Sequence, residues 1–327
     1  MTEPQHPDIA LWCQPFCQQQ WQRACQFEPD ILQGSDSEAL HQYRVSLRKT
    51  RAILGLYRAH LPASLNQLRR PLSQIMAKTN RLRDLDVFLA SHSQCMATLD
   101  TTHHAGINAF FTLLGADRDH AHQQLVHWLT GKRYARQRQQ LQYTLSSTAA
   151  PAPFSATLLN VGKALIWQHY QQVCIQTLQV SEHSADHAIH QLRIDCKKLR
   201  YALDMLPVQT DARAEQHSTT PPGTNRERKR KSRLLAGLKG LQEDLGQFND
   251  LSVQQLFINE RVQHYQQQGE ISSEIQEAVD GLLAALASQL RQKRQLILTQ
   301  LAGIGSATTY TAFAVFCQQR PSSHAVD

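Results

Sequence analysis

Apolar residues recur along almost the whole chain at spacings of three and four, the period of an amphipathic α-helix. Leu199, Leu203 and Leu206 show both spacings, and the alternation of apolar and polar residues that is typical of strands is absent. The pattern predicts an all-α fold. The helices that we expect span residues 8–27, 36–60, 63–92, 103–146, 155–180, 184–206, 231–267, 271–302 and 306–319.

Two segments interrupt the helical pattern. The run Ala149–Pro153 separates the chain into halves, and residues 207–232 are polar and contain Pro221, Pro222 and Gly223. Because the second segment has too little apolar surface to bury, we expect 207–232 to be a disordered basic loop. The sequence therefore predicts a single domain over residues 1–327, built of two repeats at about 8–148 and 155–305 and followed by a C-terminal tail at 306–327.

The overall composition favours a folded protein in a reducing compartment. Hydrophobic residues make up 41% of the chain and charged residues 19%, so there is enough apolar surface for a core. The seven cysteines contain no C-x-x-C pair, which disfavours a disulfide framework and a zinc ribbon. We find neither a signal peptide nor an apolar run long enough to span a membrane. We expect a cytoplasmic protein.

The net charge of +7 is concentrated in three segments. Residues 41–51 hold four cations and no acid, residues 190–200 hold four cations and one acid, and residues 226–233 hold six cations and one acid. Charge gathered in this way predicts an anionic partner.

An eleven-residue motif occurs twice, and both copies read H-Q-x-R-x-x-x-R/K-K-x-R. On a helix, its histidine and three of its cations share one face about 80° wide and form a stripe about 15 Å long, at 1.5 Å per residue. The stripe consists of His41, Arg44, Arg48 and Arg51 in the first copy and of His190, Arg193, Lys197 and Arg200 in the second. Lys49 and Lys198 lie on its flank.

A second pair of similar segments follows the stripes. Residues 83–87 read R-D-L-D-V and residues 249–253 read N-D-L-S-V, so that Asp84 aligns with Asp250. Two copies of a four-helix unit, related by an approximate two-fold axis, explain both the repeated motif and this second pair of segments. The 207–232 segment accounts for the longer spacing in the second copy.

The alternative to a binding stripe is a solvated helix face whose cations pair with neighbouring acids. Acids are nearly absent within either copy at positions four residues from these cations. The like charges therefore repel at a cost of a few tenths of a kcal/mol each. We favour anion binding, because the same arrangement occurs twice.

The doubled motif, followed by R-D-L-D-V, resembles the CHAD family, the conserved histidine α-helical domain. The resemblance covers about residues 8 to 305. It implies two four-helix bundles with basic helices lining a central groove or pore that binds inorganic polyphosphate. The residues that it places in this groove are His41, Arg44, Arg48, Lys49, Arg51, His190, Arg193, Lys197, Lys198, Arg200 and Tyr201.

Recognition of a linear polyanion requires cations and hydrogen-bond donors spaced along a channel. Further cations on neighbouring helices are candidates of lower rank, because the sequence does not decide which way they face. They are Arg69, Arg70, Lys78, Arg81, Arg83 and Lys239. The second copy departs from the family pattern at Lys197, Asn249 and Ser252, so we expect the second half to contribute less to binding.

Asp84 and Asp250 are interpreted as structural support, either capping a helix or holding an arginine in position. No glycine-rich phosphate loop and no acid pair common to both copies is present, so we predict a non-enzymatic binding module without a metal or a cofactor. The alternatives are a metal-dependent polyphosphate or phosphoester hydrolase and a nucleic-acid-binding protein; the second is disfavoured by an aromatic content of 7%.

The predicted partner is thus inorganic polyphosphate, the predicted location is the cytoplasm and its polyphosphate granules, and no membrane partner is expected. The sequence does not determine the oligomeric state, the preferred polyphosphate chain length or the biological use of binding.

Overall fold

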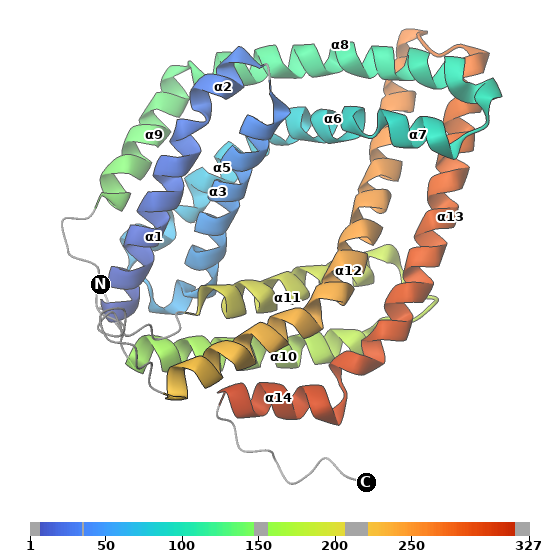
Figure 1. Ribbon diagram of the computed structural model, residues 1–327. Helices are drawn as coiled ribbons and strands as arrows, with labels where there is room; N and C mark the ends of the chain where they lie inside the picture. Colours follow the sequence, from blue (N-terminus) through green and yellow to red (C-terminus); the bar gives the residue numbers. More distant parts are fainter. Residues whose placement is uncertain (1–6, 35, 147–155, 207–221, 318–327) are drawn as a thin grey trace. The chain divides into compact units, whose positions relative to one another are not determined.

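The computed structural model describes residues 7–34, 36–146, 156–206 and 222–317, and every regular element in these ranges is a helix (Figure 1). The all-α prediction is therefore confirmed. None of the described helices combines the length and the apolar character needed to cross a membrane.

The chain forms two compact units. Unit 1 comprises Met1–Pro151 and Val253–Gln289, and unit 2 comprises Ala152–Ser252 and Leu290–Asp327. These units do not follow the two sequence repeats, because residues 253–289 belong with the first half. Two long helices, α12 (Pro222–Gln268) and α13 (Ser273–Ile304), contribute residues to both units. The division into repeats at 8–148 and 155–305 stays a prediction.

Unit 1 is built mainly from the N-terminal half of the chain. Its elements are α1 (Pro7–Gln26), α2 (Glu28–Gln33), α3 (Ser37–Leu56), η1 (Arg58–His60), α4 (Ala63–Gln67), α5 (Arg69–Lys78), α6 (Asn80–Ala90), α7 (His92–Thr98), η2 (Thr101–His103), α8 (His104–Leu129) and α9 (Lys132–Leu145). Helix α1 lies beside α3, and α6 packs along α8 (Figure 1).

The amphipathic pattern of α3 determines which side chains it leaves outside the core. Asp36 caps its N-terminus, accepting a hydrogen bond of 2.8 Å from the Glu38 amide. Tyr43, Leu47 and Leu54 are fully buried and recur at helical spacing. The cations between them consequently lie along the other side of the helix.

The helix predicted over 63–92 is divided in the structure into α4, α5 and α6. At the break between α5 and α6, the hydroxyl of the buried Thr79 donates a hydrogen bond of 2.8 Å to the Met76 carbonyl. Hydroxyl bonding to the backbone competes with continued helix hydrogen bonding. The helix predicted over 103–146 is likewise divided, at Thr130 and Gly131.

The short helix α2 was missed by the periodicity. It ends at Gly34, whose φ of 72° lies in the left-handed region, where glycine carries no steric penalty. A Cβ at this position would lie 2.4 Å from the His122 ring. His122 Nε2 in turn contacts the Ile31 carbonyl at 2.8 Å, so α8 fixes the end of α2.

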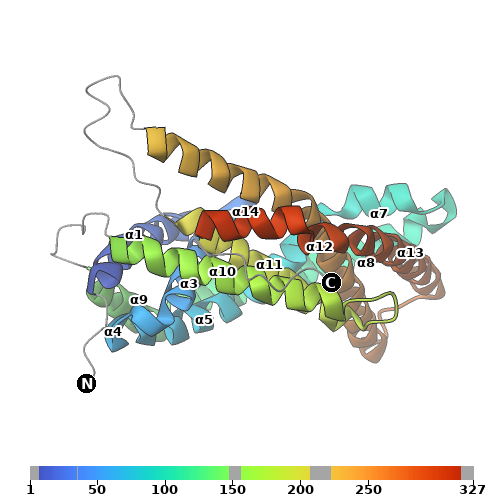
Figure 2. The same cartoon turned by 90° about the horizontal axis from the view of Figure 1, so that it is seen from below.

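Unit 2 contains α10 (Ala156–Gln179), α11 (Asp186–Met205) and α14 (Ala307–Cys317), together with parts of α12 and α13. Helix α10 packs against both α11 and α14, and in Figure 2 α14 lies between α10 and the N-terminal part of α12. Tyr170 of α10 stacks on Phe313 of α14 with ring centroids 4.0 Å apart. Its hydroxyl donates to the Ile304 carbonyl at 2.9 Å.

The prediction of a disordered loop over 207–232 is wrong for its second part. Residues 222–232 form the start of α12, while 207–221 lie outside the described residues. Arginine and lysine are good helix formers, and two contacts hold this basic segment. Lys231 donates to the carbonyls of Asp204 and Leu206 at 3.0 and 2.8 Å, capping the end of α11.

The second contact is an ion pair between Lys163 of α10 and Glu227 of α12, with Nζ and Oε1 2.6 Å apart. Lys163 is buried, with 6% of its surface exposed, and its ammonium lies 5.8 Å from the centre of the Phe316 ring on α14. The pair therefore joins three helices of unit 2.

Replacing Glu227 with glutamine should lower the free energy of unfolding by about 2 kcal/mol, because Lys163 would stay buried without its counterion. Thermal unfolding followed by far-UV circular dichroism measures the loss. The matched control is Glu243→Gln, which removes the partner of Lys239 in an exposed ion pair of the same helix. The control should cost less than about 0.5 kcal/mol, and equal losses in the two variants would contradict the clamping role of Glu227.

Candidate functional site

The first sequence stripe lies along α3 in unit 1. His41, Arg44, Arg48 and Lys49 are half-buried, and Arg51 is exposed. Arg69 of α5 and Arg83 of α6 lie close enough to affect the charges of this helix. We name the five arginines Arg44, Arg48, Arg51, Arg69 and Arg83 the α3 cation cluster.

Members of the α3 cation cluster disfavour the positive charge of Arg44, Arg51 and His41. Burial and then the nearby guanidiniums of Arg69 and Arg48 lower the pKa of Arg51. The pKa of His41 is lowered by burial first, and then by Arg83, Arg48 and Arg44, against an opposing effect of Glu38. A group of cations that disfavour each other's charge is an arrangement to which an anion adds favourable interactions.

The cluster lacks close counterions. Among the residues that the structure describes, no carboxylate lies within the 4.0 Å ion-pair distance of any of its five arginines. Asp84 is the acid whose charge favours that of Arg44, and it does so from beyond this distance. The positive charge of the cluster is therefore available to a ligand.

Arg44 has a structural role as well. Its Nη1 donates to the Met76 carbonyl at 3.1 Å, to Thr79 Oγ1 at 2.5 Å and to Asn80 Oδ1 at 2.9 Å, which are groups on both sides of the α5–α6 break. Burial, with Arg48, Arg83 and Arg51 adding, lowers the pKa of Arg44 to about 10. It remains charged at neutral pH and fixes α6 beside α3.

The two aspartates of R-D-L-D-V have different surroundings. Loss of hydration, with a contribution from Glu260, raises the pKa of Asp84, while Arg44 and Arg83 oppose the rise. Asp86 is buried and pairs with Arg118 of α8 at 3.1 Å. The motif did not identify Asp86 as a residue with its own partner. The signal that could have done so is its position beside the buried Leu85 on α6.

The second stripe lies on α11 in unit 2, and its histidine has a defined partner. His190 Nδ1 lies 2.7 Å from Asn249 Oδ1 on α12, and because an amide oxygen only accepts, the Nδ1–H tautomer is the donor. Asn249 Nδ2 lies 3.4 Å from Asp250 Oδ1. Asn249 aligns with Arg83, which affects His41 in unit 1. The residue at this aligned position therefore acts on the stripe histidine in both units, through a hydrogen bond in unit 2 and through its charge in unit 1.

One cation of the α11 stripe, Arg200, and the flanking Lys198 are already paired. Lys198 Nζ lies 2.8 Å from the buried Asp195, and Arg200 Nε lies 3.2 Å from Asp204. Arg193, Lys197 and Tyr201 are half-buried. The stripe on α11 thus carries less unneutralised charge than the cluster on α3, in line with the weaker second copy of the motif.

The CHAD domain sequence pattern matches residues 16–259. The chain belongs to the CHAD family. A crystal structure of the CHAD domain from the plant Ricinus communis is similar over 89% of this chain and 91% of its own, with 22% identity and a TM-score of 0.64. PptA from Streptomyces chartreusis is similar over 92% of this chain and all of its own, with 15% identity and a TM-score of 0.60. No curated protein matches the chain.

The lower-ranked cations of this CHAD domain have different positions. Arg69 and Arg83 join the α3 cation cluster. Arg81 pairs instead with Asp117 of α8 at 3.3 Å, an acid that Arg261 and Tyr265 also contact. Lys239 pairs with Glu243 at 3.7 Å, and Arg70 and Lys78 are exposed. Within the described ranges, no three His, Cys, Asp or Glu side chains are grouped to hold a metal ion.

Neutralising one member of the cluster should stabilise the ligand-free CHAD domain. We expect Arg48→Gln to raise the free energy of unfolding by about 0.5 kcal/mol at low ionic strength, because it relieves repulsion between like charges. The gain should shrink with added salt, as the Debye length falls from about 30 Å at 0.01 M to about 3 Å at 1 M. Urea unfolding at the two ionic strengths measures it.

The control for this experiment is Arg200→Gln on α11, which removes an arginine that is paired with Asp204. This variant should not gain stability. If Arg48→Gln is destabilising at low salt, Arg48 makes net favourable contacts and the cluster is not repulsive.

Proposed function

We propose that this CHAD protein binds inorganic polyphosphate without turning it over, and that the α3 cation cluster is the main contact. The observation that carries the proposal is the set of five neighbouring arginines without an ion-paired carboxylate among the described residues. Such a charge arrangement is unfavourable alone and favourable with a polyanion bound.

The geometry suits a linear chain of phosphates. From His41 to Arg51, α3 advances about 15 Å at 1.5 Å per residue, with a cation at each turn. Guanidinium groups present a fork of donors to phosphate oxygens and can bind them in bidentate fashion. Arg69 and Arg83 widen this strip to the neighbouring helices, so that successive phosphates meet successive arginines.

The remaining predicted contacts belong to the proposal in a secondary role. In unit 1 these are His41 and Lys49. In unit 2 they are His190, Arg193, Lys197, Lys198, Arg200 and Tyr201, several of which already have partners. A central groove lined by both stripes stays a prediction, as does a location at polyphosphate granules in the cytoplasm.

The surroundings of α3 favour polyphosphate over single-stranded nucleic acid. Stacking of bases on aromatic side chains supplies much of the affinity for single strands. Tyr43 is the one Phe, Tyr or Trp residue of α3, and it is fully buried. Its hydroxyl lies 3.0 Å from that of Tyr134 on α9. The cluster therefore offers charge without a stacking surface of its own.

Reversing two charges of the cluster tests the proposal. We expect Arg48→Glu with Arg51→Glu to weaken polyphosphate binding by at least about tenfold and to flatten its dependence on salt, because fewer counterions are released. These two arginines are chosen because Arg44 also holds the α5–α6 break. The measurement is a polyphosphate titration at several salt concentrations, with helicity checked by circular dichroism.

The matched control is Arg228→Glu with Lys229→Glu, the same charge change at exposed positions of α12. Equal losses in the two double variants would mean that general basicity accounts for binding. A preference for nucleic acid over polyphosphate at matched salt would favour the nucleic-acid alternative. Orthophosphate release with Mg²⁺ or Mn²⁺ that Asp84→Ala abolishes would favour the hydrolase alternative.

The affinity for polyphosphate should also depend on pH through His41. Burial and the neighbouring arginines lower its pKa below the ordinary value in the ligand-free protein, which favours the neutral ring. A nearby phosphate favours the charged ring and raises this pKa, so binding takes up a proton. Affinity should therefore increase as the pH falls from about 8 toward about 6.

The comparison that isolates this effect is His41→Gln, because the other histidines contribute to any general trend with pH. Calorimetric titrations in buffers of different ionisation enthalpy give the number of protons taken up. We expect this number to fall in His41→Gln. An unchanged proton uptake would show that His41 does not meet the ligand.

A further inference from the structure

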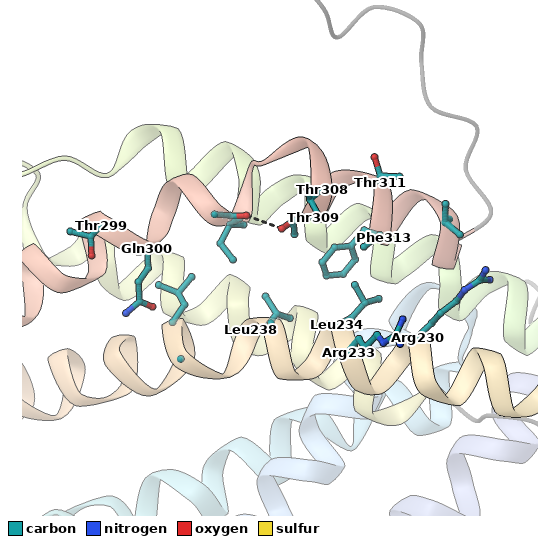
Figure 3. A pocket seen from close by; sticks show the side chains of 17 residues that line it. Arg230, Arg233, Leu234, Leu238, Thr299, Gln300, Thr308, Thr309, Thr311 and Phe313 are labelled. Carbon is teal, nitrogen blue, oxygen red and sulfur yellow. Dashed lines mark hydrogen bonds between the residues drawn. The ribbon is translucent and has the colours of Figure 1, made fainter.

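A cavity of about 720 Å³ lies in unit 2, and none of its lining residues belongs to α3 or α11. Its walls come from the N-terminal part of α12, the end of α13 and α14 (Figure 3). Leu234 and Leu238 of α12 and Phe313 of α14 line its apolar part. Helix α14 lies beyond residues 16–259, which the CHAD pattern matches. We call this cavity the α12–α14 trough.

One face of α12 lines the trough with an unusual set of residues. Arg230, Arg233, Gly237 and Gly240 follow one another at spacings of three and four, so they share a helix face. All four line the cavity. Two arginines thus stand at the N-terminal end of this face, and two residues without side chains follow them.

The two glycines are not required by packing within the chain. A Cβ at Gly237 would meet nothing within 4 Å, and one at Gly240 would meet only Gln300 Oε1, at 3.9 Å. Glycine inside a helix costs roughly 0.5 to 1 kcal/mol relative to alanine. What the glycines do provide is open volume, because a larger side chain at either position would fill the trough.

The two ends of the trough differ in charge. Arg230 and Arg233 lie at one end, and Thr299 and Gln300 lie at the other (Figure 3). Among the described residues, neither arginine has an ion-paired carboxylate. At the opposite end Gln300 donates to Asp244 at 2.5 Å, and Asp244 also binds Lys293 at 2.9 Å. An anionic group is therefore favoured at the arginine end alone.

The walls of the trough are fixed by contacts described above. The Lys163–Glu227 pair and the bonds from Lys231 to the end of α11 hold α12 by another of its faces. Tyr170 holds α14 through Phe313 and the end of α13 through the Ile304 carbonyl. Because α12 and α14 are anchored by these other contacts, the arginines and glycines of α12 remain directed toward the trough.

We propose that the α12–α14 trough binds a single-chain amphiphile of the fatty-acid class. Its carboxylate binds Arg230 and Arg233, and its aliphatic chain lies over Gly237 and Gly240 against Leu234, Leu238 and Phe313. The volume falls within the range of about 300 to 1,000 Å³ that is usual for small-molecule sites. An apolar lining with cations at one end matches this ligand class, and the absence of side chains at the glycines lets an alkyl chain approach the helix closely.

The test is calorimetric titration of the full chain with laurate below its micellar concentration. Dodecanol has the same chain length without the charge and should bind at least about tenfold more weakly, as should laurate to Arg230→Ala with Arg233→Ala, because hydrogen bonds to charged groups are worth about this much. Absence of laurate binding to the unmodified chain overturns the proposal, as does equal binding of dodecanol.

A filling variant separates loss of the trough from loss of the fold. Gly237→Leu should weaken laurate binding at least about tenfold while thermal stability is kept or raised, because leucine is the better helix former. The matched control is Gly246→Leu on the same helix, where an added Cβ also meets nothing within 4 Å but which does not line the trough. It should bind laurate normally. Equal weakening by both substitutions overturns the assignment to the trough.

Two further readouts exclude other occupants. Polyphosphate binding should be unchanged in Gly237→Leu, so a failure here leaves the proposed function of the α3 cation cluster untouched. Sedimentation of the unmodified chain and of Gly237→Leu should give the same oligomeric state. If the substitution abolishes self-association, or if the chain binds anionic phospholipid vesicles through the trough and not monomeric laurate, the proposal is wrong.

Discussion

Repulsion among the arginines of α3, α5 and α6 opposes the folding of unit 1, and the other contacts of this unit have to compensate for it. Burial of Tyr43, Leu47 and Leu54 on the opposite side of α3 supplies the favourable term that keeps this helix in place. The break between α5 and α6 contributes as well, since its carbonyl and side-chain oxygens receive the guanidinium of Arg44. The fold thus holds the charges together at a cost in stability, and binding of the polyanion that we propose as the ligand would recover that cost.

The stripe of unit 2 is similar in sequence, but acids of the same helix neutralise part of its charge. The position of Asp195 is occupied in the first copy by the buried Ser46, so one substitution between the repeats replaces a hydroxyl by a carboxylate and gives Lys198 a partner. Asp204 does the same for Arg200. The two copies of one motif therefore differ in how much charge they present, although their helices are alike.

The sequence predicted well those features that depend on helical period. It predicted the all-α fold, which the structure confirms, and it separated the buried side chains of α3 from the cations on the other side of that helix. It did not decide the direction of Arg69, Arg81 and Arg83, because α5 and α6 are separate helices whose rotation depends on the break at Thr79. It was wrong about the start of α12, where composition suggested disorder. Long-range partners, Lys163 for Glu227 and the end of α11 for Lys231, hold that segment, and no local pattern reveals them.

The division of the chain between the units has a consequence for synthesis. Unit 1 is discontinuous: Phe88 packs on Phe257 with ring centroids 5.3 Å apart, and Asp117 bonds to Arg261 and Tyr265. These partners are separated by more than a hundred residues of chain. On the ribosome, α6 and α8 therefore emerge long before the part of α12 that covers them. The N-terminal half therefore keeps apolar surface exposed during synthesis. Unit 1 reaches its final form only when residues 253–289 have been translated.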